Sequence, residues 1–151
     1  MASSHSRALF SQQFATAFRA WRRAADEALA RYGLSQATAW PLVQAARHGE
    51  GIRQGALAAL LGIEGPSLVR TLDHLCAAGL VLRQEDPADR RARTIHLTEA
   101  GHVQAARAET VLAGLRARLL RGVSPADLEA AFRVLETIQA ATGNRETEMS
   151  A

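Results

Sequence analysis

Four polar side chains share one stripe of a predicted helix. The stripe consists of residues that recur at helical spacing: Ser67, Arg70, Thr71 and His74. Each can hydrogen-bond a base edge or a phosphate. Arg70 is the candidate for a bidentate contact to guanine and Ser67 for an adaptable base contact, whereas Thr71 and His74 are candidates for holding phosphates. The alternative interpretation is the solvated face of an ordinary amphipathic helix.

A second group of charges follows directly after this helix. Four arginines lie within eleven residues, at Arg83, Arg90, Arg91 and Arg93. Such a group can neutralise phosphates even though the net charge of the chain is only +3.

The segment that carries these arginines predicts a hairpin. Short strands are expected at 80–84 and 93–97, which leaves a long charged loop over 84–92. In that loop Asp89 could pair with Arg91 or Arg93, while another arginine projects. An exposed arginine on a narrow β-ribbon suits a minor groove. The alternative is a charged turn that only keeps the hairpin soluble.

The elements that must position these residues are mostly helices. Apolar spacing and helix-terminating residues predict helices at about 6–31, 38–47, 54–61, 66–78, 99–121 and 125–142. Pro41 favours a start of the second helix near Thr38 rather than Ser35, because proline is tolerated in a first turn. The short third helix, the glycine turn at 62–65 and the polar-striped fourth helix describe a helix-turn-helix. The expected fold class is mainly α with a small β-hairpin.

Composition excludes several classes of protein. A single cysteine, Cys76, rules out an internal disulfide and any cysteine-rich metal site. It is expected to be a small buried hydrophobe, with a redox switch as the alternative. No apolar run approaches a membrane span, and the first residues do not resemble a signal peptide, so we expect a cytoplasmic protein. We find no paired carboxylates, phosphate loop or nucleophile–base pair. We therefore expect no enzyme, no cofactor and no metal site.

These segments resemble the MarR family, and within it the SlyA branch. The resemblance is carried by Gly62–Leu75 (GIEGPSLVRTLDHL), Ala78–Val81, Asp89–Arg93 (DRRAR) and His96–Glu99, and it is dense from about 34 to 101. It implies one domain over 1–151 with a winged helix-turn-helix lobe at 34–98. The helices at 6–33 and 99–142 would interlock two subunits.

The resemblance also implies a function. Such a protein is a homodimeric transcriptional regulator of double-stranded DNA, often a repressor, which binds a pseudo-palindromic operator. Ser67 and Arg70 would lie in the major groove, Arg91 would enter the minor groove, and Asp89 would brace the wing. A winged-helix module for protein–protein contact, without DNA binding, is the alternative.

An effector site is implied as well, for a small aromatic carboxylate. The matching positions are Arg19, Trp21, Arg22, Thr38 and Trp40. Arg22 lies beside the apolar stripe of the first helix, where it could pair with a carboxylate while Trp40 stacks on the ring. The alternative is an arginine whose stem covers the core and tryptophans that belong to the core.

Overall fold

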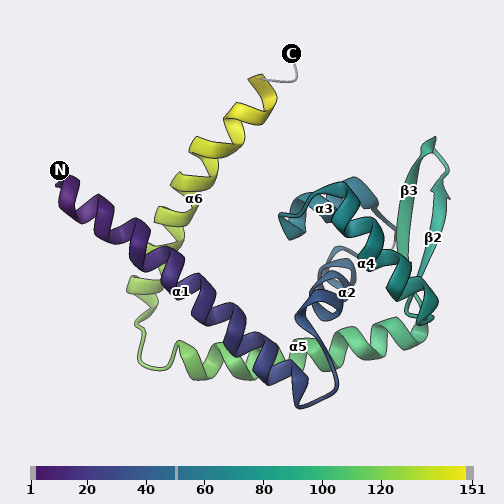
Figure 1. The fold of residues 1–151 in the computed structure, drawn as a ribbon, viewed down its shortest axis with the longest axis horizontal. Helices are drawn as coiled ribbons and strands as arrows, with labels where there is room; N and C mark the ends of the chain where they lie inside the picture. Colours follow the sequence, from purple (N-terminus) through teal and green to yellow (C-terminus); the bar gives the residue numbers. More distant parts are fainter. Residues whose placement is uncertain (1–2, 50, 149–151) are drawn as a thin grey trace. The chain divides into compact units, whose positions relative to one another are not determined.

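The elements of the fold alternate between helices and a small sheet. The computed structural model describes residues 3–49 and 51–148, with side chains as far as Thr142. In chain order the elements are α1 Ser4–Ala30, α2 Gln36–His48, β1 Ile52–Arg53, α3 Gln54–Leu61, α4 Gly65–Ala77, β2 Val81–Asp86, β3 Asp89–Leu97, α5 Glu99–Leu119 and α6 Pro125–Glu148 (Figure 1). Two compact units divide the chain, one ending at Arg116 and one beginning at Ala117. In the described part, no helix combines the length and apolar character needed to cross a bilayer.

The predicted fold class is confirmed, and the sheet contains one strand more than expected. The sheet is antiparallel with the order β1-β3-β2, and β1 pairs Ile52 with Ile95 and Arg53 with Thr94. The sequence analysis missed β1 because two residues are too short to show an alternating pattern.

The hairpin is built differently from the prediction. Instead of a long loop over 84–92, β2 and β3 run almost to the tip and leave only Pro87 and Ala88 between them. Asp86 decides this, since it is buried. Its Oδ1 accepts a hydrogen bond from the Ala88 amide at 2.8 Å, and its Oδ2 accepts one from Arg53 Nε at 2.6 Å. The register then shifts, so that Glu85 faces Arg93 while Asp86 faces Asp89.

The start of α2 is also a correction. The helix begins at Gln36, because Ser35 caps it by accepting a hydrogen bond from the Thr38 amide at 3.3 Å. Pro41 therefore lies inside the helix rather than in its first turn. Proline there removes a single backbone hydrogen bond, and the cap together with the burial of Pro41 outweighs that cost.

Two apolar clusters hold the first unit together. One fills the lobe formed by α2, α3, α4 and the sheet, with Leu57, Leu68 and Leu72 fully buried at its centre. The other joins the C-terminal half of α1 to α2 and α5. Its buried side chains are alanines, leucines and one valine, among them Leu29 of α1, Val43 of α2 and Leu115 of α5. The lobe and the long helices thus share α2.

The second unit consists largely of α6. Its start matches the predicted cap: Ser124 Oγ accepts the Asp127 amide at 3.1 Å and donates to the Asp127 carboxylate at 2.6 Å. Its backbone stays helical to Glu148, beyond the expected end near Thr142. Gly143 and Asn144 lower helix propensity but do not block the backbone hydrogen bonds as proline would.

Candidate nucleic-acid interface and neighbouring cavity

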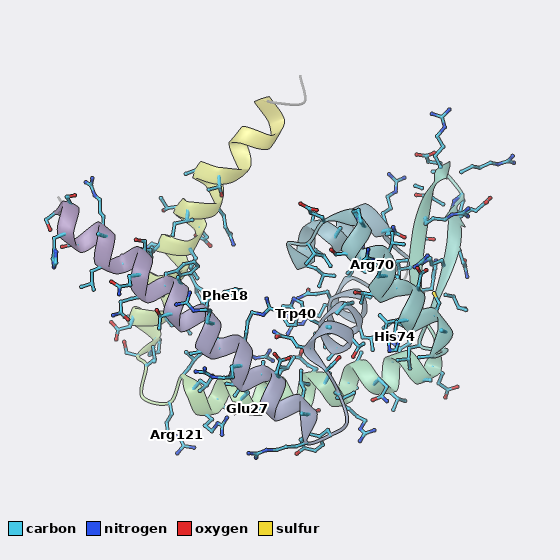
Figure 2. All side chains as sticks on the ribbon, viewed as in Figure 1. Phe18, Glu27, Trp40, Arg70, His74 and Arg121 are labelled. Atoms are coloured by element: carbon cyan, nitrogen blue, oxygen red, sulfur yellow. The ribbon has the colours of Figure 1, made fainter. Side chains whose placement is uncertain are left out.

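The outer face of α4 presents an arginine and a histidine. The helix begins at Gly65 with Pro66 in its first turn, where the missing proline amide costs little. Leu68, Leu72 and Leu75 fix the opposite face in the core. Arg70 and His74 are exposed along the helix, as Figure 2 shows. These two side chains are free to meet a groove and its phosphates.

The other two members of the predicted stripe lie at the edge of a cavity. Ser67 is exposed and Thr71 is half-buried, and both line the cavity next to Ile63. Thr71 Oγ1 donates to the Ser67 carbonyl at 3.2 Å. The four polar residues therefore cover two neighbouring surfaces of α4 rather than one.

The wing carries its arginines on β3 and not in a loop. Arg90, Arg91 and Arg93 are all exposed. The Arg91 amide donates to Asp89 Oδ1 at 3.0 Å, so Asp89 shapes the backbone of the tip. Arg93 pairs with Glu85 at 3.0 Å, its partner across the sheet, rather than with Asp89. Figure 1 shows β2 beginning close to the C-terminal end of α4, with the tip of the β2–β3 hairpin pointing away from that end.

Arg83 does not belong with the other three arginines. Its side chain is only 25% exposed, and its Nη2 donates to the Val69 carbonyl at 3.0 Å and to Asp73 Oδ1 at 2.8 Å. Val69 and Asp73 both lie on α4, so Arg83 ties the wing to that helix. We expected Arg83 to neutralise a phosphate, but in the structure it forms internal hydrogen bonds to α4 instead.

Arg53 is a candidate phosphate contact that the sequence analysis missed. It stands at the start of α3 and, with Arg91 and Arg93, lines a cavity of about 370 Å³. Only the pairing of β1 with β3 brings Arg53 beside these arginines, so no local signal could have found it. Its partner Asp86 has a pKa below the ordinary 3.8. The Ala88 amide lowers this pKa most, burial opposes, and Arg53 lowers it further.

A larger cavity of about 760 Å³ lies between α1, α2, α5 and the start of α4. Three of the five predicted effector residues line it: Trp21, Arg22 and Trp40. Figure 2 labels Phe18 and Trp40, which reach the cavity from α1 and α2. Its volume and its mainly apolar walls suit a drug-sized organic molecule.

The remaining two predicted effector residues are elsewhere. Arg19 lies outside the cavity and donates to Thr16 Oγ1 at 3.2 Å. Thr38 lies beside the N-terminal cap of α2, where its hydroxyl hydrogen-bonds Ser35. Arg19 is three residues from Arg22, but the cavity lies on the side of α1 where Arg22, Ala25 and Leu29 point.

Two further arginines line the cavity, and the sequence analysis missed both. Arg47 of α2 and Arg116 of α5 each donate a hydrogen bond to Glu109 of α5. Burial raises the pKa of Glu109, but the hydrogen bonds from Arg116 and Arg47 and the two positive charges outweigh burial, so this pKa lies below 4.5. Glu109 stays ionised at neutral pH and holds both arginines.

Among the described residues, no three His, Cys, Asp or Glu side chains lie close enough together to bind a metal ion. Cys76 is half-buried, and its thiol forms no disulfide.

The known proteins that this chain resembles are transcriptional regulators. A family model described as the MarR family matches residues 32–92. The structure of the transcriptional regulator PA3341 is 38% identical with a TM-score of 0.82, and the match covers 89% of this chain and 98% of that one. A MarR-family regulator from Rhodococcus sp. RHA1 is 26% identical with a TM-score of 0.79, over 93% and 99% of the two chains.

A further similar structure contains a ligand. CouR from Rhodococcus jostii RHA1 was solved bound to p-coumaroyl-CoA. It is 27% identical with a TM-score of 0.78, and the match covers 85% of this chain and 90% of CouR.

Proposed function

The chain belongs to the MarR family of winged-helix transcriptional regulators, and from this premise we propose that it represses transcription as a homodimer on a pseudo-palindromic operator. It is a regulator and not an enzyme, as the sequence predicts. We further propose that residues 1–151 act as one domain of the SlyA branch, working in the cytoplasm where the operator DNA lies.

The observation that carries DNA binding is the set of exposed arginines, with one exposed histidine, on two adjacent elements. Arg70 and His74 project from α4, and Arg90 and Arg91 project from the wing that Arg83 fastens to α4. A helix of this width fits a major groove, and a narrow ribbon with an exposed arginine fits the next minor groove. In this arrangement Arg70 reads base edges, Arg91 enters the minor groove, and Ser67 contacts DNA from the edge of α4.

A homodimer is supported by apolar side chains that the described chain leaves uncovered. Along α1, Phe10 is 43% exposed, Phe14 is 44% exposed and Phe18 is 55% exposed, and the rings of Phe10 and Phe14 stack at 6.1 Å. Along α6, Phe132 and Ile138 are also exposed. Contiguous exposed apolar surface marks interaction sites, and a second copy of these helices would bury it. A two-fold dimer places two copies of α4 roughly 34 Å apart, one turn of DNA.

We propose that an aromatic carboxylate occupies the larger cavity and weakens DNA binding. Arg22 would pair with the carboxylate, and Trp21 and Trp40 would contact the ring. The p-coumaroyl group of the CoA ester bound by CouR is likewise an aromatic acyl group, although as a thioester it carries no carboxylate charge. Because Ser67 and Thr71 of α4 form part of the wall, a ligand in the cavity would contact the helix that we assign to the major groove.

The DNA-binding proposal is tested with fragments of the source genome. The full chain is used to select bound fragments, and binding to the recovered sequence and to a scrambled version is measured by fluorescence anisotropy at several salt concentrations. We expect the recovered sequence to be preferred, and log K to fall linearly with log salt concentration. A protein–protein module would show neither preference nor salt dependence, and that result would refute the proposed function.

The effector proposal has its own measurement. Tryptophan fluorescence is titrated with salicylate and with hydroxynicotinate, and the same acids are added to the protein–DNA complex. We expect saturable quenching and release of DNA. No quenching together with unchanged DNA binding would refute this part and leave the DNA-binding part standing.

A further inference from the structure

The larger cavity carries positive charge in two places. Arg22 reaches it from α1 near the start of α2, where its Nε donates to Gln36 Oε1 at 3.5 Å. Arg47 and Arg116 reach it at the other end of α2. Gln36 and Arg47 are eleven residues apart on the helix, a rise of about 16 Å. The two groups of cations are therefore separated along the length of α2.

The pair at the far end is held in place by one carboxylate. Arg47 Nη2 lies 3.0 Å and 2.9 Å from the two oxygens of Glu109, and Arg116 Nη2 donates to Oε1. Each guanidinium contacts Glu109 through its Nη2 alone. In the described part of the chain, the Nε and Nη1 atoms of both have no hydrogen-bond partner. A guanidinium carries five donors in a fixed fork, so both retain donors for an anion.

The surroundings favour an anion over any other occupant of this end. Glu109 does not line the cavity, and no carboxylate among the described residues does. The trio of Arg47, Arg116 and Glu109 keeps a net charge of +1. The Arg47 guanidinium also lies over the Trp40 ring, 5.9 Å from its centroid, which fixes it against an aromatic wall.

We propose that Arg47 and Arg116 form a second anion-binding subsite, and that the ligand of this cavity is an elongated aromatic molecule with a negative group at each end. One group pairs with Arg22, the body lies against Trp40, and the other group pairs with Arg47 and Arg116. The inference rests on the proposed effector function and defines the chemical class of the effector. Glu109 is a positioning residue that orients both arginines.

The test compares three probes that share one aromatic body. Biphenyl-4,4′-dicarboxylate, biphenyl-4-carboxylate and biphenyl-4-carboxamide are titrated into the full chain by isothermal titration calorimetry. We expect the dicarboxylate to bind about tenfold tighter than the monocarboxylate, since one added charge-assisted pair is worth roughly that factor. The carboxamide should bind most weakly. Equal affinities for the two acids would overturn the proposal.

Variants locate the second subsite. In Arg116→Met, the dicarboxylate and the monocarboxylate should bind with nearly equal affinity. The affinity for the monocarboxylate itself should change by less than about twofold, because Arg22 remains. Arg47→Met is the second variant and should act in the same direction. Arg107→Met, an exposed arginine on the same helix, is the matched control and should keep the tenfold preference. A preference that survives both Arg116→Met and Arg47→Met would overturn the assignment.

Operator binding by the same proteins separates the two levels of the argument. Arg116→Met and Arg47→Met should bind operator DNA like the unaltered chain in the absence of probe. If the unaltered chain binds the operator but shows no preference for the dicarboxylate, the second subsite is wrong and the DNA-binding function stands. If the unaltered chain binds no operator, the proposed function itself fails, whatever the probes show.

Discussion

At the scale of single residues, the surroundings of two arginines near α4 distinguish Arg70, which we propose reads base edges, from Arg83. Arg70 projects from α4 with no internal partner in the described part of the chain, whereas Arg83, thirteen residues later, donates through its Nη2 to the Val69 carbonyl and to Asp73. Both are arginines near the same helix, and their surroundings assign them different tasks.

Replacing Arg70 should therefore affect specificity. Arg70→Ala is expected to weaken operator binding by about 1–3 kcal/mol while leaving the affinity for scrambled DNA within a small factor, since a bidentate base contact discriminates by that amount. Anisotropy titrations on both duplexes measure it, with Arg107→Ala as the control. An equal loss on both duplexes would contradict base reading by Arg70.

Arg83 should behave as a structural link. Arg83→Met is expected to lower the free energy of unfolding by about 1 kcal/mol, because it removes one hydrogen bond to a carbonyl and one partly exposed ion pair. The slope of log K against log salt concentration for operator binding should stay unchanged, whereas loss of a phosphate contact would reduce it by about one. Urea unfolding and salt titrations test the two statements, and a reduced slope with unchanged stability would reverse the assignment.

At the scale of elements, the wing depends on a buried carboxylate at its turn. Asp86 accepts hydrogen bonds from the Ala88 amide and from Arg53, and it thereby joins β2, the turn and the start of α3. This hydrogen bonding explains why a highly charged stretch that contains Pro87 forms strands on both sides of a two-residue turn.

The lowered pKa of Asp86 gives a pH dependence with a definite sign. Its ionised form is favoured in the folded state, so its stabilising contribution is complete above the ordinary pKa of 3.8 and is lost as pH falls through the lower folded pKa. Asp86→Asn should therefore be less stable than the unaltered chain near pH 7, and the difference should shrink below about pH 4.

Urea unfolding over a series of pH values measures this difference. Asp26→Asn, at an exposed position of α1, serves as the control and should leave the pH profile unchanged. A stability difference between Asp86→Asn and the unaltered chain that is the same at every pH would rule out the carboxylate's charge as the cause.

At the scale of the whole molecule, the described chain leaves several large aromatic side chains of α1 exposed to solvent. Every described residue of α1 up to Ala20 is exposed, including the stacked pair Phe10 and Phe14. The lobe that carries α4 and the wing has its own buried core. Loss of pairing should therefore leave the lobe folded but remove the second DNA contact.

Phe14→Glu tests this expectation. The charge would be placed in the proposed subunit interface, so we expect a shift toward monomer and a large loss of operator affinity, because one lobe contacts one half-site. Light scattering coupled to gel filtration measures the mass. Val103→Glu, at an exposed apolar position of α5, is the control and should remain dimeric. A Phe14→Glu protein that stays dimeric would place the interface elsewhere.

Features that depend on neighbours along the chain were predictable from the amino-acid sequence. Helical spacing placed α3, the glycine turn and α4 correctly, Ser124 and Thr98 marked helix starts, and the arginines of the wing were recognised as a group. These signals are local, since capping, turn chemistry and amphipathic spacing act within a few residues.

Features that depend on residues far apart in sequence became visible in the folded chain alone. Asp86 looked like part of a solvated loop until Arg53, 33 residues earlier, proved to be its partner. Glu109 lies 62 residues from Arg47 and holds it beside the larger cavity, whereas the sequence analysis placed Arg19 and Thr38 among the effector residues. Ser67 and Thr71 border that cavity because α4 lines it together with residues of α1, α2 and α5. Packing between distant segments decides which side chains are buried, which groups they pair with and which surface they face. No local sequence pattern encodes these properties directly.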